Sequence, residues 1–377
     1  MTRAPRLAEL TTLRLGGPPA RLVETTTEAD LVAAVRAADE GGEPLLVLGG
    51  GSNVVVSDTG FPGVVVRDTR RDVVVEGDVG TCGGASIRVP AGTPWEDVVD
   101  RAVEEGWVGV EALTGIPGST GATPVQNVGA YGQEVAGVVS TVRVWDRAQG
   151  RVRTLAVGEL GFGYRTSVLK RSLRAEGSDG GPSGWAPTPR FVVLDVGFQL
   201  RLGALSAPIA YPELAALLDV PVGQRAPLTE VRAAVRRLRA RKGMLLDAAD
   251  PDTWSAGSFF TNPVLAVDLA DTLPDGAPRY PVRTAVPETT TGPSLGAIDP
   301  GLVKTSAAWL IEHAGFGRGF GLPGPVGVST KHTLALTNRG DGTTAELLAL
   351  ARTVRDGVRE RFGVTLEPEP VLVGVSL

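Results

Sequence analysis

Apolar and polar positions change their spacing several times along the chain, and each change marks an expected helix or strand. In the first third, apolar residues recur at helical spacing from Thr27, a suitable N-cap, through Ala38, and Gly41 ends the run. Short runs rich in β-branched residues surround this helix and favour strands. We expect these strands at residues 44–48, 54–56, 64–66 and 73–75. A second helix is expected from Thr93, with Pro94 at its first helical position.

The middle third is richer in strand patterns, and helical spacing returns after it. Strands are expected at residues 138–145, 152–156 and 191–200. A basic helix is expected over residues 229–242, where Val231, Val235 and Leu238 share one face.

The C-terminal part combines a long helix with one last strand. The helix opens at a capping box of Thr343 and Glu346 and ends near Gly363. The strand is expected over residues 364–375, with prolines interrupting its regularity. Two stretches rich in Gly, Pro, Ser and Thr are expected as surface loops, the first of them mobile, at residues 178–189 and 274–293.

The composition indicates a folded protein of two or three domains. The chain has 377 residues, is 42% hydrophobic and carries a net charge of −5, which excludes global disorder and gives no basic footprint for nucleic acid. Cys82 is the single cysteine, so no intramolecular disulfide can form. With His313 and His332 as the two histidines, we expect no metal site.

No targeting or membrane signal stands out. The N-terminal run MTRAPRLAELTTLRLGG lacks the apolar region of a signal peptide. No run of about 18 or more apolar residues is present, so no membrane-spanning helix is expected. We therefore expect a cytoplasmic monomer without nucleic-acid or membrane partners.

The first glycine-rich stretch has the composition of an anion-binding turn. An expected strand is followed directly by Gly49, Gly50, Gly51, Ser52 and Asn53. Consecutive glycines let backbone N–H groups converge on an anion such as a pyrophosphate, and the last two residues add side-chain donors. A tight turn between strands fits equally well. Val54 stands where a third glycine would complete the Rossmann fingerprint, so that fold is not indicated.

The second glycine-rich stretch, residues 115–132, mixes permissive backbone with small hydroxyl and amide side chains. This chemistry suits close approach to a planar cofactor with polar edges. Ile116, Val125 and Val128 make the stretch too apolar for a flexible linker. The candidate cofactor contacts are Gly115, Pro117, Gly118, Ser119, Gly121, Ala122, Gln126, Asn127, Gly129, Ala130 and Tyr131.

Together the two stretches, GGGSN and IPGSTGATPVQNVGAYGQE, resemble the paired FAD-binding signature of the UDP-N-acetylenolpyruvoylglucosamine reductase family. Further matches follow in order at residues 163–165, 257–263 and 366–369, so the resemblance covers nearly the whole chain. It implies an α+β protein with a vanillyl-alcohol-oxidase-type FAD-binding fold of two subdomains plus a C-terminal α/β substrate domain. The expected boundaries are 1–68, completed by 366–377, then 69–228 and 229–365.

The resemblance implies reduction of UDP-N-acetylglucosamine enolpyruvate to UDP-N-acetylmuramate in peptidoglycan precursor synthesis, and hence a role in cell-wall biogenesis, cell shape and cell division. NADPH reduces noncovalently bound FAD, which delivers hydride to the terminal enolpyruvyl carbon, and an acid protonates the neighbouring carbon. Hydride addition pushes negative charge toward the substrate carboxylate. The protein must stabilise that charge and place a proton donor nearby.

Three residues match the family's catalytic positions. Ser258 is implied as the proton donor, and its context, Ala-Gly-Ser-Phe-Phe, lacks the nucleophile elbow of hydrolases. Arg165 is implied as the fork that binds the substrate carboxylate. Glu369 is implied as the acidic group beside it, with Glu367 as the competing candidate. Without the other motifs, Ser258 would indicate a turn cap and Arg165 a surface ion pair.

Three further residues are implied as substrate contacts. Lys242 ends the basic helix and is equally suited to the helix dipole or to NADPH phosphates. Tyr211 resembles a substrate-loop tyrosine, and a core tyrosine fits nearly as well. Asn262 either binds substrate or orients the serine. The chain departs from many relatives at Thr261, where they carry lysine.

Two other functions remain open. An oxidase of the same flavin fold would tether FAD through His or Cys, and near the glycine-rich stretches only Cys82 is available. A non-catalytic sugar-nucleotide-binding protein would keep the fold. The complete set of Ser258, Arg165 and Glu369 argues against that second alternative.

Overall fold

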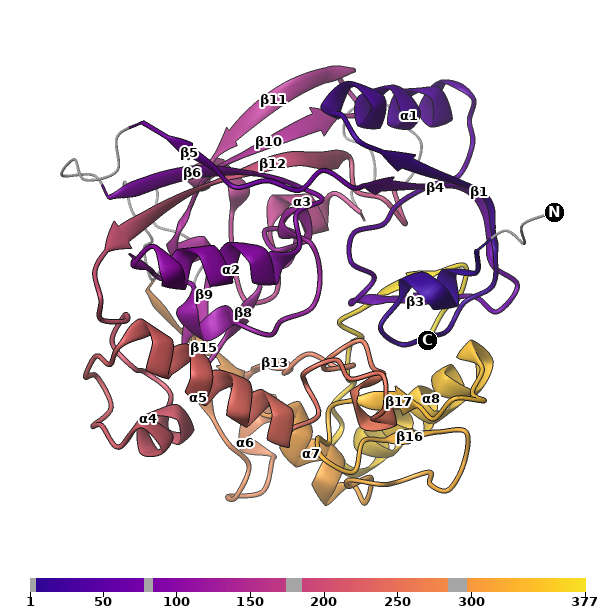
Figure 1. The fold of residues 1–377 in the computed structure, drawn as a ribbon. Coiled ribbons are helices and arrows are strands. Elements are labelled where there is room, and N and C mark those ends of the chain that lie inside the picture. The colour runs from indigo at the N-terminus through magenta and orange to yellow at the C-terminus, as the bar shows by residue number, and fades with distance from the viewer. Residues whose placement is uncertain (1–4, 78–83, 174–184, 284–296) are drawn as a thin grey trace.

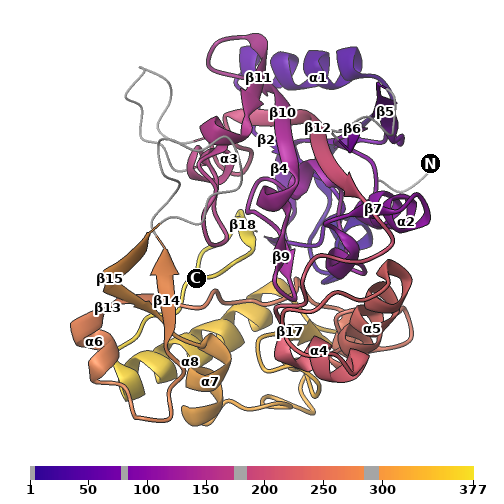
Figure 2. The same cartoon turned by 90° about the vertical axis from the view of Figure 1, so that its left-hand side faces the viewer.

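The computed structural model describes residues 5–77, 84–173, 185–283 and 297–377 (Figure 1). Two β-sheets and their flanking helices form one half of the molecule, and most helices of the C-terminal half gather in the other (Figures 1 and 2). This combination of segregated helices and sheets confirms the expected α+β class.

The N-terminal sheet is parallel and has the order β1-β4-β2. Its strands are β1 (Pro19–Thr25), β2 (Leu45–Val47) and β4 (Phe61–Asp68). Helix α1 (Glu28–Glu40) connects β1 to β2, and the Thr27 hydroxyl accepts a hydrogen bond from the Asp30 N–H at 3.1 Å. The expected N-cap is confirmed, because this side chain satisfies a backbone donor that the helix leaves free.

The two ends of the chain meet in a separate two-stranded sheet. The last strand, β18 (Val371–Val373), pairs in parallel with β3 (Val54–Val56), which follows the first glycine-rich stretch directly. This pairing supports our proposal that residues 366–377 complete the first subdomain, 1–68.

The last strand is shorter than expected. Of residues 364–375, only those of β18 are strand, because Pro368 and Pro370 carry no backbone donor for a ladder. The N–H between them, that of Glu369, donates to the Phe259 carbonyl at 2.9 Å. The segment before β18 is therefore attached to the loop that carries the candidate serine.

The second sheet is antiparallel, with the order β11-β10-β12-β6-β5 and β7 paired to β12. Its strands are β5 (Val74–Glu76), β6 (Ala85–Pro90), β7 (Trp107–Val108), β10 (Val139–Asp146), β11 (Arg151–Ala156) and β12 (Phe191–Leu202). Helix α2 (Trp95–Glu104) covers one face, and its buried Trp95 packs against Phe198 of β12 at a ring separation of 5.9 Å. Three short elements lie between β7 and β12 in the sequence: β8 (Gly129–Ala130), β9 (Gln133–Glu134) and α3 (Val168–Arg171).

Helix α2 begins one residue later than expected. Pro94 has an extended ψ of 134° and is the N-cap rather than the first helical residue. The Trp95 N–H donates to the Gly118 carbonyl at 3.0 Å, and Pro94 forms a β-bridge with Ser119. The second glycine-rich stretch thus supplies the acceptor at this helix start, which local sequence could not show.

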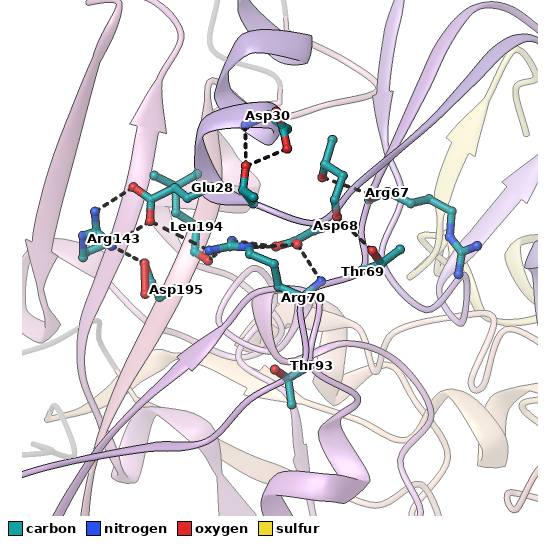
Figure 3. Close-up of polar contacts among 12 residues, drawn as sticks. Glu28, Asp30, Arg67, Asp68, Thr69, Arg70, Thr93, Arg143, Leu194 and Asp195 are labelled. Atoms are coloured by element: carbon teal, nitrogen blue, oxygen red, sulfur yellow. Dashed lines mark hydrogen bonds and ion pairs between the residues drawn. The ribbon is translucent and has the colours of Figure 1, made fainter.

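The two sheets are joined by an apolar core and by a network of charges. Leu31 and Val35 of α1 share a core cluster with Trp145, Val192 and Leu194 of the second sheet. A network of charged side chains lies beside this core (Figure 3).

In this network, Arg143 of β10 forms ion pairs with Glu28 of α1, at 2.8 Å, and with Asp195 of β12 (Figure 3). Arg70 pairs with Asp68 at 2.6 Å and donates to a carbonyl of β12 at 2.8 Å. Only 4% of the Asp195 side chain is exposed. These contacts hold the end of β4 and the start of α1 against the second sheet.

Helices α6 (Val267–Asp271), α7 (Ala307–His313) and α8 (Thr344–Phe362) of the C-terminal part build a further core, which also includes Leu13, Leu15 and Val55. Figure 2 shows the antiparallel sheet β13-β15-β14 at its side. The strands are β13 (Val264–Ala266), β14 (Tyr280–Arg283) and β15 (Ile298–Lys304), and a hairpin consists of β16 (Val326–Val328) and β17 (Leu336–Asn338). The expected capping box of Thr343 and Glu346 is confirmed, and α8 ends at Gly363, whose φ is +68°.

Helices α4 (Pro212–Leu218) and α5 (Leu228–Arg241) pack together in a smaller core. The proposed boundary at 228/229 would separate them, so we propose to place it ahead of α4. No helix in the described parts of the chain is both long and apolar enough to cross a bilayer.

The two expected surface loops lie partly outside the described residues, which exclude 174–184 and 284–296. The described end of the first loop is packed rather than mobile: the Thr188 hydroxyl accepts from the Val47 N–H at 2.8 Å and donates to the Leu45 carbonyl at 2.9 Å. Within the second loop, residues 280–283 form β14.

The charged network predicts a clear difference between two arginine substitutions. Arg143→Met should lower the free energy of unfolding by about 1–3 kcal/mol, because the nearly buried Asp195 loses its main partner. Arg36→Met, which removes an exposed pair with Glu40, should change it by less than about 0.5 kcal/mol. Urea unfolding followed by tryptophan fluorescence measures both, and equal shifts would contradict a joining role for Arg143.

Candidate active site

A cavity of about 330 Å³ lies where the two sheets meet the C-terminal part. Segments far apart in the sequence line it, including both glycine-rich stretches, the end of β2, β12, α3, α5 and the loop before β13. The expected cofactor contacts that line it are Gly49, Gly50, Gly51, Ser52, Asn53, Pro117, Gly118, Ser119, Gly121, Ala122, Gln126, Gly129 and Ala130. The three expected catalytic residues, Ser258, Arg165 and Glu369, line the same cavity.

The two glycine-rich stretches pack directly against each other. A Cβ atom on Gly50 would lie 2.6 Å from Cα of Gly118, and one on Gly49 would lie 2.3 Å from Oγ of Ser119. The Ser52 hydroxyl donates across the contact to the Pro117 carbonyl at 2.7 Å. Glycine is required here because the two backbones touch, which adds to the anion-binding reason given by the sequence.

A chain of polar contacts connects three parts of the molecule inside the cavity. Asn53 Nδ2 donates to Gln126 Oε1 at 2.7 Å, and Gln126 Nε2 donates to Glu369 Oε1 at 3.1 Å. Arg165 Nε lies 3.2 Å from the same carboxyl oxygen. Asn53 follows the first glycine stretch, Gln126 and Arg165 belong to the middle of the chain, and Glu369 precedes β18.

The Arg165 backbone is left-handed, with a φ of +51°, and the side chain is held by main-chain carbonyls. Its Nη2 donates to the Gly129 carbonyl at 3.0 Å. Its Nε is buried and, despite the nearby carboxyl oxygen, is not aligned for a hydrogen bond with any described residue. This buried donor of the guanidinium is therefore left without a hydrogen bond among the described residues.

Burial raises the pKa of the Glu369 carboxyl group, and the positive charges of Arg165 and Lys170 and the hydrogen bond from Gln126 oppose this shift only in part. The carboxyl side chain is 11% exposed. Glu367, the alternative candidate, is exposed, and its carbonyl accepts from Thr261 N–H at 3.1 Å. The structure therefore places Glu369, and not Glu367, at the cavity.

Ser258 is positioned by Gly257 before it and by Phe259 and Phe260 after it. Gly257 adopts a φ of +74°, and Phe259 and Phe260 are buried in the C-terminal core with 1% exposure each. The anchored phenylalanines fix the loop, and the serine lies at the cavity wall. The Ser258 hydroxyl makes no hydrogen bond with the described residues, so the structure gives no support to a turn cap.

Six expected contacts lie away from the cavity lining: Gly115, Asn127, Tyr131, Tyr211, Lys242 and Asn262. Asn127 is buried and holds the loop by donating to Glu134 Oε2 at 2.7 Å. Tyr131 and Tyr211 meet edge to face at 5.3 Å, and Lys242 pairs with Glu213 at 2.5 Å.

The Asn262 side chain binds the start of helix α7, whose N-cap is Ser306. Its Oδ1 accepts the Ala307 N–H at 2.9 Å, at the first residue of α7. The Asn262 backbone N–H donates to the Tyr164 hydroxyl at 3.3 Å, and the Lys304 ammonium lies 4.3 Å from the centre of that ring. A substrate contact for Asn262 stays a prediction.

The chain matches the family model described as UDP-N-acetylenolpyruvoylglucosamine reductase, C-terminal domain, over residues 250–373, and an FAD binding domain over residues 19–156. Reductases of this name from Salinispora arenicola and Nocardia farcinica are 52% and 54% identical, over 98% and 99% of this chain and 95% and 90% of theirs. The chain belongs to the UDP-N-acetylenolpyruvoylglucosamine reductase family. The crystal structure of the reductase from Thermus caldophilus superposes with a TM-score of 0.60 at 25% identity, covering 98% of this chain and 97% of that one.

These matches confirm the expected vanillyl-alcohol-oxidase-type FAD-binding fold, and the reductase is an FAD-dependent oxidoreductase. The residues at the cavity fit such a cofactor. Two buried donors without a hydrogen-bond partner among the described residues, Nε of Arg165 and Nε of Arg239, belong to side chains that line it. Lys170 adds a third positive charge, while the acidic lining residues are Asp68, paired with Arg70, and Glu369.

Two cations of this lining were not among the expected site residues. Lys170 lies in α3, whose N-cap Ser167 is buried in the loop after Arg165. Arg239 continues the buried face of α5, four residues after Val235. A charged residue on the apolar face of a helix is the signal that could have identified Arg239.

The raised pKa of Glu369 predicts the pH dependence of stability in the reductase. The wild type should lose stability as pH rises from about 4.3, the ordinary glutamate value, through the higher folded pKa, because folding then requires a buried charge. Glu369→Gln has no such charge, so its free energy of unfolding relative to wild type should rise over this range and stay constant below it. Urea unfolding of flavin-free protein between pH 4 and 8 measures the difference.

The exposed neighbour provides the matched control, because Glu367→Gln makes the same substitution two residues away at an exposed position. A difference for Glu369→Gln that falls as pH rises would mean that Arg165 dominates the environment of this carboxyl group.

Proposed function

We propose that the chain uses NADPH and bound FAD to reduce UDP-N-acetylglucosamine enolpyruvate to UDP-N-acetylmuramate in peptidoglycan precursor synthesis. The observation that carries this proposal is the convergence of Ser258, Arg165 and Glu369, from three remote segments, on the cavity lined by both glycine-rich stretches. The names of the relatives from Salinispora arenicola and Nocardia farcinica support the same reaction. We propose a cytoplasmic location and a monomer, with roles in cell shape and division following from the pathway.

Bound FAD would supply the hydride chemistry, and the chain's own residues would supply binding, charge and the proton. The glycine-rich stretches would hold the cofactor noncovalently, since neither histidine lines the cavity. Cys82, the other residue considered as a tether, lies outside the described residues.

Arg165 would bind the substrate carboxylate. Two main-chain carbonyls, those of Gly129 and Asn127, lie within 3.0 and 3.5 Å of its terminal nitrogens, so the charge is held in place before substrate arrives. A positive charge fixed in this way stabilises negative charge on the carboxylate without reorganisation at the moment of reaction.

Glu369 would act beside it in its neutral form. Its Oε1 accepts from Gln126 and lies next to Arg165, which leaves Oε2 to carry the proton. A neutral carboxyl group can donate a hydrogen bond to the substrate carboxylate, whereas an ionised one would repel it. The raised pKa supports this role.

Ser258 would donate the proton to the substrate carbon. Its hydroxyl is free of hydrogen bonds to the described residues and lies at the cavity wall. A serine hydroxyl is a weak acid, but the enediolate formed after hydride addition is a strong base, so placement decides the transfer.

The UDP diphosphate and the NADPH phosphates would bind outside the cavity. Lys242 and Tyr211 lie together there with Tyr131, and Lys242 is 5.8 Å from the centre of the Tyr131 ring. Glu213 forms an ion pair with Lys242. A phosphate that binds Lys242 would displace the Glu213 carboxylate.

The contact between the glycine-rich stretches predicts the FAD content of two variants. Gly50→Ala should lower bound FAD at least about tenfold, because its Cβ would collide with the Gly118 backbone. Gly158→Ala should keep wild-type content, since nothing lies within 4 Å of its Cβ position. Acid precipitation should release all flavin for quantification, and flavin that stays with the pellet or a fully loaded Gly50→Ala protein would contradict this proposal.

The division of roles predicts how substitutions affect the two half-reactions, measured anaerobically by stopped flow. Ser258→Ala should leave reduction by NADPH nearly unchanged and slow reoxidation by UDP-N-acetylglucosamine enolpyruvate by about 10²–10⁴-fold. Arg165→Ala should slow the same half-reaction and weaken substrate binding, and the double variant should be non-additive. Glu367→Gln is the control.

Reoxidation of Ser258→Ala at the wild-type rate would assign the proton to another group. Flavin that is reoxidised by oxygen and not by the enolpyruvyl substrate would identify an oxidase instead.

A further inference from the structure

Arg239 is a buried cation without a carboxylate of its own. It lies on the apolar face of α5, and its side chain lines the cavity that Ser258 lines. Nη2 donates to the Met244 carbonyl at 2.8 Å, and the buried Nε has no hydrogen-bond partner among the described residues. The nearby carboxylate of Glu96 is bound by Arg236 instead.

The positive charge of Arg239 is maintained against the cost of burial. Burial lowers its pKa to about 10, so the guanidinium stays charged at neutral pH. Burial, together with the charges of Lys242 and Arg239, lowers the pKa of His332 to about 4, so this neighbouring imidazole is neutral. Glu96 opposes the effect of burial only in part and forms no ion pair with Arg239. A buried charge without an ion-pair partner is characteristic of a functional site.

Glu96 holds the start of the second glycine-rich stretch, against which Arg239 packs. Its carboxylate accepts from the Thr114 hydroxyl at 2.8 Å, from the Gly115 N–H at 2.5 Å and from Arg236 Nη1 at 2.5 Å. Gly115 has a φ of +71°, and a Cβ there would lie 3.2 Å from Arg239 Nε. Arg239 is therefore held against the first residue of the second glycine-rich stretch.

The surroundings of Arg239 select the kind of negative charge it would meet. A diphosphate carries charge that is normally bound by several donors, whereas Arg239 is a single cation whose neighbours along the cavity include the apolar Ile116 and Met244. A single, delocalised negative charge fits this environment. Uptake of hydride places such a charge on the ring system of a flavin.

We propose that Arg239 is the cation that balances the negative charge which the FAD ring acquires on reduction. The residue makes the reduced cofactor easier to form and takes no part in the proton transfer that we propose for Ser258. This assignment depends on FAD binding alone and not on the proposed substrate.

Sulfite tests this role without NADPH or substrate. Its sulfur forms a bond to a ring nitrogen of oxidised flavin, and the electron pair that forms the bond leaves the ring negatively charged, as reduction does. The flavin-loaded variants Arg239→Met and Arg239→Lys are compared with Arg237→Met, which removes an exposed charge from the same helix. Absorbance gives the sulfite dissociation constant, and equilibration with a reference dye gives the reduction potential.

Arg239→Met should bind sulfite at least about tenfold more weakly, and its two-electron potential should fall by at least about 30 mV, which corresponds to a tenfold change in the equilibrium constant. Arg239→Lys should stay closer to the wild type than Arg239→Met does. The control, Arg237→Met, should match the wild type. Arg239→Gln, whose amide can still donate to the Met244 carbonyl, replaces Arg239→Met if that variant does not retain FAD.

Wild-type sulfite affinity and potential in the neutral variant that retains FAD would overturn the assignment. A rise confined to the KM for the UDP substrate or NADPH would identify Arg239 as a phosphate-binding residue. Because the sulfite titration uses neither compound, an error in the proposed substrate would leave its result intact.

Discussion

The buried carboxyl group of Glu369 is the contact on which the cavity depends. Its partners come from separate parts of the chain: Gln126 donates to it, Asn53 holds Gln126, and Arg165 supplies the nearest positive charge. Its own backbone N–H is bound by Phe259, next to Ser258. A buried carboxyl group needs such partners, because an unsatisfied one would be costly. The candidate site therefore forms only when both FAD-binding subdomains and the C-terminal part are together.

Charge around the cavity follows from the same burial. Arg165, Lys170 and Arg239 line it, while burial favours the neutral form of Glu369 and Asp68 is neutralised by Arg70. The lining is accordingly suited to negative charge, both on a cofactor and on a carboxylate substrate. Main-chain carbonyls hold Arg165 and Arg239 at fixed positions, so little reorganisation of these two is needed when negative charge develops.

Much of the local structure could be predicted, because its causes lie within a few residues of sequence. The cap at Thr27, the capping box at Thr343 and the strand over residues 54–56 follow from hydrogen bonding and side-chain shape over one or two turns. Errors appeared where a distant segment supplied the partner. Pro94 is an N-cap because the Trp95 N–H bonds to the Gly118 carbonyl. The last strand does not extend back to Glu369, which lies between two prolines, because the Glu369 N–H bonds to the Phe259 carbonyl.

By itself, the sequence determined the α+β class, the two glycine-rich stretches and the residues that match the family's motifs, since these depend on residue type and spacing. The tertiary structure decided which of them share a cavity: it distinguished Glu369 from the exposed Glu367 and placed Tyr211, Lys242 and Asn262 outside the lining. It also brought in Arg239, which motif and composition had left among many other arginines. The reason is physical, because burial and the loss of ion-pair partners arise only when remote segments pack, and these set the charge of each group.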